Sequence, residues 1–119
     1  EEINEAYEMA IGHARHDLSI NPQETRTRAY LAFYLAVSGD ERHALDEITQ
    51  IMNAGTKDVI ALRLCIRAYE MMGMRDNALD MLLVYFEADG PLDQIQNNPD
   101  LIDMQMDPKY RELIQSRNK

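Results

Sequence analysis

Apolar residues along most of the chain recur three or four positions apart, which is the spacing of one face of a helix. Leu45, Ile48 and Met52 follow this pattern, and no segment shows the sustained two-residue alternation of a half-buried strand. We therefore predict an all-α fold. The expected helices cover about 2–20, 24–38, 41–54, 58–72 and 75–88.

Local signals explain where these helices end and begin. Gly39 and Gly73 each follow an apolar run, at the place where a left-handed residue turns the chain out of a helix. Asp40 is positioned to cap the next helix, and Asn21-Pro22 ends the first one because a residue before proline is pushed out of the helical region. The segment 55–58 closes the third helix and opens the fourth.

The chain also carries an internal repeat. Gly39 and Gly73 are 34 positions apart, and Ala10, Ala44 and Ala78 are spaced by the same 34. A repeating helix pair of this length cannot bury its apolar face alone, so neighbouring pairs must stack to form a core. The repeat therefore predicts a solenoid of antiparallel helix pairs.

The residues at these positions resemble the tetratricopeptide repeat. That family has small residues where the two helices of a pair meet, glycine at the turn and alanine early in the second helix. The matching residues here, in order, are Ala32, Leu35, Gly39 and Ala44, then Tyr69, Gly73 and Ala78. The resemblance implies about two and a half repeats within residues 1–89: a half repeat over 1–22 and repeats over 24–56 and 58–89.

The remaining residues, 90–119, are similar to the tails that close tetratricopeptide arrays in bacterial serine/threonine kinases, nucleotide cyclases and transcription activators. Asn98-Pro99 and Asp107-Pro108 each combine an N-cap with proline at the first helical position, so we expect two short helices to begin there. We expect a helical C-terminal cap whose apolar face covers the last repeat. That face would consist of Leu101, Ile102, Met104, Tyr110, Leu113 and Ile114.

Composition narrows the class of protein. The chain has 119 residues, one cysteine and a formal net charge of −9. This length fits one domain with a real core, and the single cysteine provides no disulfide framework. The acidic balance disfavours nucleic acid and anionic membranes as partners, because both are bound through clustered Lys and Arg. We expect a cytoplasmic protein without a membrane-spanning helix.

The sequence contains no constellation that predicts catalysis or a cofactor. Glycine-rich phosphate loops, paired cysteines and HExxH are all missing. His13, His16 and Asp17 could form a weak divalent-metal site, but surface histidines on a helix are the ordinary interpretation. Cys65 lies in an apolar helical run and is expected to be a buried structural thiol. We therefore expect no enzyme activity, no cofactor and no metal.

The resemblance implies a concave groove lined by the first helix of each pair. Arginine beside aromatic residues suits a peptide with carboxylates and an apolar anchor, so the partner could be acidic. The alternative is that these arginines pair with the domain's own acids, including Asp93, Asp100 or Asp103 of the tail. The expected groove residues are Arg26, Tyr30, Phe33, Arg63, Arg67 and Met71.

Three functions follow from these observations. The first is a noncatalytic protein–protein interaction module that binds a peptide or partner domain in the groove. The second, implied by the resemblance of the tail, is a regulatory segment of a bacterial kinase or cyclase whose catalytic domain lies outside this fragment. The third is self-association as a homodimer, because a truncated first repeat would expose an apolar end.

Overall fold

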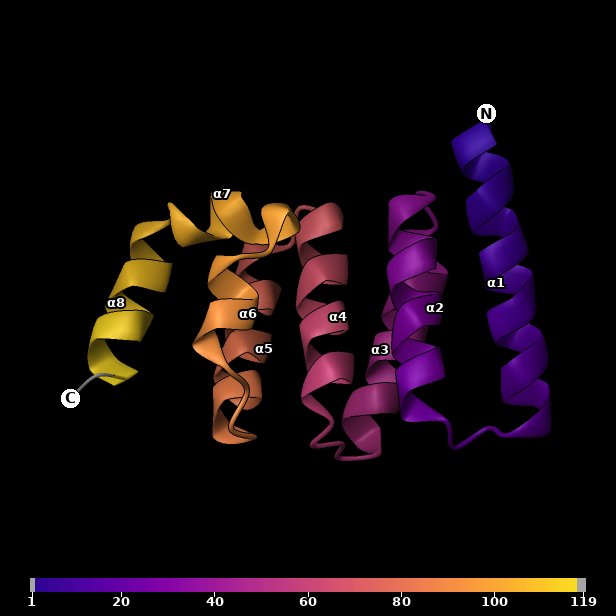
Figure 1. Cartoon of the computed structure of the whole chain (residues 1–119), viewed down its shortest axis with the longest axis horizontal. Coiled ribbons are helices and arrows are strands. Elements are labelled where there is room, and N and C mark those ends of the chain that lie inside the picture. The colour runs from indigo at the N-terminus through magenta and orange to yellow at the C-terminus, as the bar shows by residue number, and fades with distance from the viewer. Residues whose placement is uncertain (1, 118–119) are drawn as a thin grey trace.

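The computed structural model describes residues 2–117, with side chains from residue 5 onward, and all regular secondary structure in this part is helical (Figure 1). The all-α prediction is therefore confirmed. The first five helices are α1 (Glu2–Ile20), α2 (Thr25–Val37), α3 (Glu41–Asn53), α4 (Val59–Met71) and α5 (Arg75–Glu87). The C-terminal segment contains α6 (Leu92–Gln96), the 3₁₀ turn η1 (Pro99–Leu101), α7 (Ile102–Gln105) and α8 (Pro108–Arg117).

The turns form as the local signals predict. Gly39 and Gly73 have φ of +90° and +71°, a region that residues with a side chain rarely adopt. The Asp40 carboxylate accepts a hydrogen bond from the backbone N–H of His43, and the Asp58 carboxylate accepts one from Ile60, so both acids are N-caps. The helix boundaries are thus set by residues at the turns themselves.

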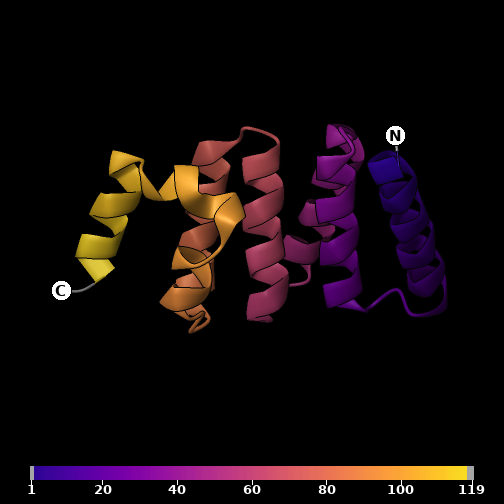
Figure 2. The ribbon, with the colours of Figure 1, turned by 45° about the horizontal axis from the view of Figure 1, so that its top comes forward.

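The helices form two layers. α2 packs against α1, α3 and α4, and α4 in turn packs against α5 and η1. In Figure 1, α3 and α5 lie in a layer behind that of α2, α4 and α6. Figure 2 shows that α1, α2, α4 and the C-terminal segment follow one another along the length of the molecule. Elements distant in sequence therefore share one side of the protein.

Small residues favour close packing of the central helices. Ala29 and Ala32 share a face of α2, Ala61 and Ala68 share a face of α4, and all four are completely buried. Helix axes come nearest where side chains are short, so these alanines allow close approach of the helices that pack against α2 and α4.

The C-terminal segment covers the end of this core, with two departures from the prediction. Leu101, Met104 and Tyr110 are buried as expected. The prediction that Ile102 belongs to the buried face is wrong, because Ile102 is 53% exposed. Ile102 begins α7 directly after η1, and the 3₁₀ turn changes the helical register, so the buried face falls on Leu101 and Met104 instead. The short helix α6 precedes the two helices predicted from the proline positions.

The connection from α5 into α6 depends on one close backbone approach. The Tyr85 hydroxyl donates a hydrogen bond of 2.6 Å to the Pro91 carbonyl. Gly90 lies against the Tyr85 ring so closely that a Cβ atom at this position would overlap the ring. Glycine is required here for space rather than for backbone conformation.

No helix in the described part of the chain combines the length and hydrophobicity needed to cross a bilayer.

The close helix contacts can be tested by overpacking. Ala78 in α5 is completely buried, so Ala78→Leu should lower the free energy of unfolding by about 1–3 kcal/mol. Ala6→Leu adds the same atoms at an exposed position of α1 and serves as the control. Urea unfolding followed by circular dichroism compares the two. Equal stability of Ala78→Leu and wild type would contradict a close helix contact at this alanine.

Candidate functional site

We call the residues expected to line a groove the α2–α4 face: Arg26, Tyr30 and Phe33 on α2, and Arg63, Arg67 and Met71 on α4. Spacings of three or four positions place each set of three along one side of its own helix. The residues from α2 and α4 meet at Phe33 and Arg67, where the Arg67 guanidinium carbon lies 4.3 Å from the centre of the Phe33 ring.

The remaining residues of the α2–α4 face diverge from this meeting point. Tyr30 turns toward α1 and stacks on Tyr34, with ring centres 6.0 Å apart. Arg63 lies beside Tyr85 of α5. Burial raises the pKa of Tyr85, and the nearby Arg63 guanidinium opposes part of that increase. Met71 is exposed at the C-terminal end of α4. The structure thus joins Phe33 and Arg67 directly and distributes the other residues around them.

Two arginines of the α2–α4 face are held by the domain's own acids. Arg26 forms a two-point contact with Asp58, at 3.0 Å from Nε to Oδ2 and 3.2 Å from Nη2 to Oδ1. Arg67 binds Asp100 of η1, with Nε and Nη2 at 2.9 and 2.8 Å from the same carboxylate oxygen. Burial raises the pKa of Asp58, but the bonds from Arg26 and from the Ile60 N–H outweigh it, so the net shift is downward. These two arginines are not a free cationic patch.

Aromatic rings extend the surface from α4 back to α1. The rings of Tyr7 and Tyr34 are 6.0 Å apart, and those of Tyr34 and Phe33 are 6.3 Å apart. Tyr30 and Met71, which are 39% and 46% exposed, leave apolar surface accessible on either side of the Phe33–Arg67 stack. The face therefore offers accessible aromatic and aliphatic surface beside its arginines.

Two of the histidines, His13 and His16, lie on α1, and Cys65 is completely buried in α4. His13 and Asp17 line a small hollow of about 240 Å³ between α1 and α2. Within residues 2–117, no group of three His, Cys, Asp or Glu side chains is arranged to hold a metal. Burial raises the pKa of the Cys65 thiol to about 12, which keeps it protonated and unreactive near neutral pH.

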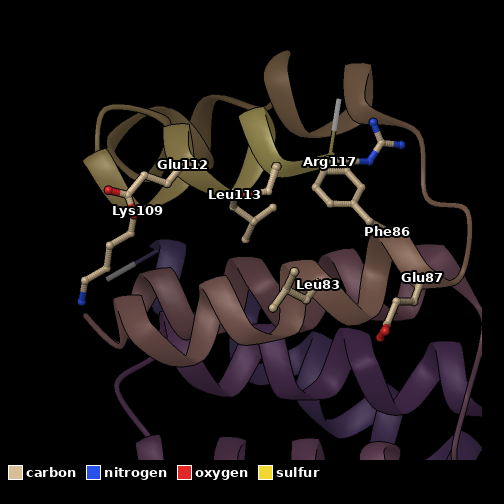
Figure 3. Close-up of a pocket in the computed structure, with 8 residues that line it drawn as sticks. Leu83, Phe86, Glu87, Lys109, Glu112, Leu113 and Arg117 are labelled. Carbon is tan, nitrogen blue, oxygen red and sulfur yellow. The ribbon is translucent and has the colours of Figure 1, made fainter. Parts of the chain in front are cut away.

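A cleft between α5 and α8 is a feature that the sequence analysis missed. Its volume is about 590 Å³, and its apolar surface comes from Leu83 and Phe86 of α5 and Leu113 of α8. Figure 3 shows Leu113 and Leu83 directed toward each other across the gap, with Lys109 and Arg117 at opposite ends. The available signal was a second apolar face on α5: Leu82 is completely buried, whereas the adjacent Leu83 is 50% exposed.

Polar contacts hold α8 beside α5. Arg75 at the start of α5 bonds Glu70 at 2.7 Å and Asp107 at 3.0 Å. Lys109 bonds Asp76 at 2.9 Å, and the Arg117 guanidinium carbon lies 4.3 Å from the centre of the Phe86 ring. The contacts of Arg75 and Lys109 join the start of α5 to the start of α8, and the contact of Arg117 joins the ends of the two helices. The helices α5 and α8 therefore run in the same direction.

The chain matches no family model, no curated protein and no solved structure. Its function is therefore argued from the two surfaces described above, the α2–α4 face and the α5–α8 cleft.

The attachment of α8 should depend on pH. The backbone N–H of Lys109 and then the Arg75 guanidinium hold the pKa of Asp107 below its ordinary 3.8. A lowered folded-state pKa stabilises the fold above about pH 5, and this contribution is lost as the pH falls through 3.8 and below. Asp107→Asn keeps a capping oxygen but removes the charge. It should be less stable than wild type at pH 7, with the difference closing at low pH.

Urea unfolding at several pH values measures this difference. Asp46→Asn is the control, since Asp46 is exposed and forms no ion pair within the described residues. If the difference in free energy of unfolding between Asp107→Asn and wild type stays constant with pH, the result would contradict the role of the Asp107 charge.

Removing the hydroxyl group from each of two buried tyrosines should change stability in opposite directions. The Tyr110 hydroxyl is buried and has no hydrogen-bond partner among the described residues, whereas the Tyr85 hydroxyl donates to Pro91. An unpaired buried hydroxyl costs about 1–3 kcal/mol, and a satisfied one stabilises by about 1 kcal/mol. Tyr110→Phe should therefore match or exceed wild-type stability, and Tyr85→Phe should fall below it. Equal losses in thermal or urea unfolding would contradict this assignment.

Proposed function

We propose that this protein is a noncatalytic protein-interaction module, built as a tetratricopeptide-like helix-pair solenoid with a helical C-terminal cap. The turn geometry supports the repeat. Left-handed residues recur at Gly39 and Gly73 and again at Gly55 and Asp89, and the members of each pair are 34 positions apart. The close contact of α2 with α4 also fits stacked pairs in which successive first helices pack side by side.

The observation that carries the proposal is the exposed apolar surface around the Phe33–Arg67 stack. Tyr30 and Met71 lie on different helices, yet both belong to the α2–α4 face and both are more than a third exposed. Aromatic residues are enriched among the side chains that dominate binding energy, and methionine adapts to varied partners. We infer that an extended peptide or a partner domain binds across α2 and α4 at this place.

The charges of the face limit how the partner is recognised. Arg26 and Arg67 already have carboxylate partners, and the protein as a whole is acidic. Nε and Nη2 of Arg67 both face one oxygen of Asp100, and its Nη1 forms no hydrogen bond among the described residues, so a donor remains for an acceptor of the partner. An apolar anchor thus supplies most of the affinity, and an acidic group of the partner orients it at Arg67.

The proposal is tested by removing the exposed apolar side chains. Tyr30→Ser with Met71→Ser should reduce capture of the partner at least tenfold, because each removes about 1.5–3 kcal/mol of potential apolar burial. Met9→Ser with Ile20→Ser removes exposed apolar side chains from α1 and serves as the matched control. Affinity capture from host lysate, quantified by mass spectrometry, compares the two double variants after circular dichroism confirms that both are folded.

The comparison has two informative results. Loss of one set of proteins only in the Tyr30/Met71 variant supports the α2–α4 face as the binding surface. Equal capture by both double variants and the wild type would refute it.

A further inference from the structure

We propose that the α5–α8 cleft is a second docking site, independent of the α2–α4 face, and that it receives a basic amphipathic helix from a partner protein. Leu83 is half exposed on α5, in the middle of a cleft whose other apolar walls are Phe86 and Leu113. Half-exposed leucine beside two further apolar side chains is surface that a partner can bury.

The shape of the cleft favours a helix. Two helices that run in the same direction but do not close against each other leave a linear groove between them. A third helix fits such a groove by placing apolar side chains at i, i+3, i+4 and i+7 into it. The volume of about 590 Å³ lies within the roughly 300–1,000 Å³ of typical ligand pockets, so it accommodates several large side chains.

The rim of the cleft favours a positively charged partner. Glu87 of α5 and Glu112 of α8 line it, and neither forms an ion pair within residues 5–117. The two bases of the rim are already engaged: Lys109 is paired with Asp76, and Arg117 is stacked on Phe86. Lys or Arg on the flanks of a bound helix would therefore meet carboxylates that have no internal partner.

The charge of the whole protein points the same way. A net charge of −9 attracts a basic partner over several ångströms and speeds its association. The same charge disfavours a second copy of this chain as the occupant, because two acidic molecules repel each other. The stated occupant is therefore a basic helix and not a dimer partner.

Two synthetic peptides of about 14 residues, roughly four helical turns, test this proposal. Both place leucine at i, i+3, i+4 and i+7; one carries lysine and the other glutamate at the remaining positions. Fluorescence anisotropy with the intact protein should detect binding of the Leu–Lys peptide and at least tenfold weaker binding of the Leu–Glu peptide. Equal binding of the two would overturn the charge argument.

Variants of the protein locate the binding site. Leu83→Gln should weaken binding of the Leu–Lys peptide at least tenfold, whereas Met9→Gln on α1 should leave this binding unchanged. The double variant Glu87→Gln/Glu112→Gln should weaken binding of the Leu–Lys peptide severalfold more than the double variant Glu41→Gln/Asp46→Asn does. The second pair makes the same change of net charge on α3. Circular dichroism confirms that each variant is folded.

Each opposite result counts against the cleft. Wild-type binding by Leu83→Gln would place the peptide elsewhere, and equal effects of the two charge-changing pairs would show attraction to net charge alone. A concentration-dependent dimer in light scattering that Leu83→Gln dissociates would identify a second copy as the occupant. None of these variants alters Tyr30 or Met71, so the outcome is separate from that of the α2–α4 face.

Discussion

The contact between α2 and α4 is the constraint from which the rest of the arrangement follows. α2 and α4 pack directly against each other, with α3 packed on α2 and α5 on α4. Arg67 reaches the Phe33 ring because the helices that carry them are adjacent. A larger side chain along the α2–α4 contact would move the two helices apart and, with them, the surface residues that they carry.

The C-terminal segment uses the same helices as its base. Ile95, Leu101 and Met104 of the segment are completely buried, and the Arg67–Asp100 ion pair joins η1 to α4. The charges of that pair remain about a quarter to a third exposed, so solvent screening limits its contribution. The same pair neutralises an arginine of the α2–α4 face. The attachment of the segment and the chemistry of the face are thus linked through one residue.

The position of α8 creates the second surface. The polar contacts of Arg75 and Lys109 hold the start of α8 against α5, while Leu113 stays short of complete burial. Polar contacts fix where a helix lies without excluding water from the space beside it, so an apolar cleft persists between the helices. The two surfaces differ in character: arginines paired with internal carboxylates mark the α2–α4 face, and carboxylates without an internal partner mark the cleft.

Local chemistry determined where the first five helices begin and end. Gly39, Gly73 and Asp40 act within a few residues of themselves, so their effect on a boundary does not depend on the rest of the fold. Only the tertiary structure decided which distant groups meet. Asp100 is 33 positions from Arg67, and three tail acids were equal candidates for it until η1 was placed on α4. The exposure of Ile102 and the cleft beside Leu83 were likewise decided by how whole helices pack, because periodicity shows which residues share a face but not which face finds a partner.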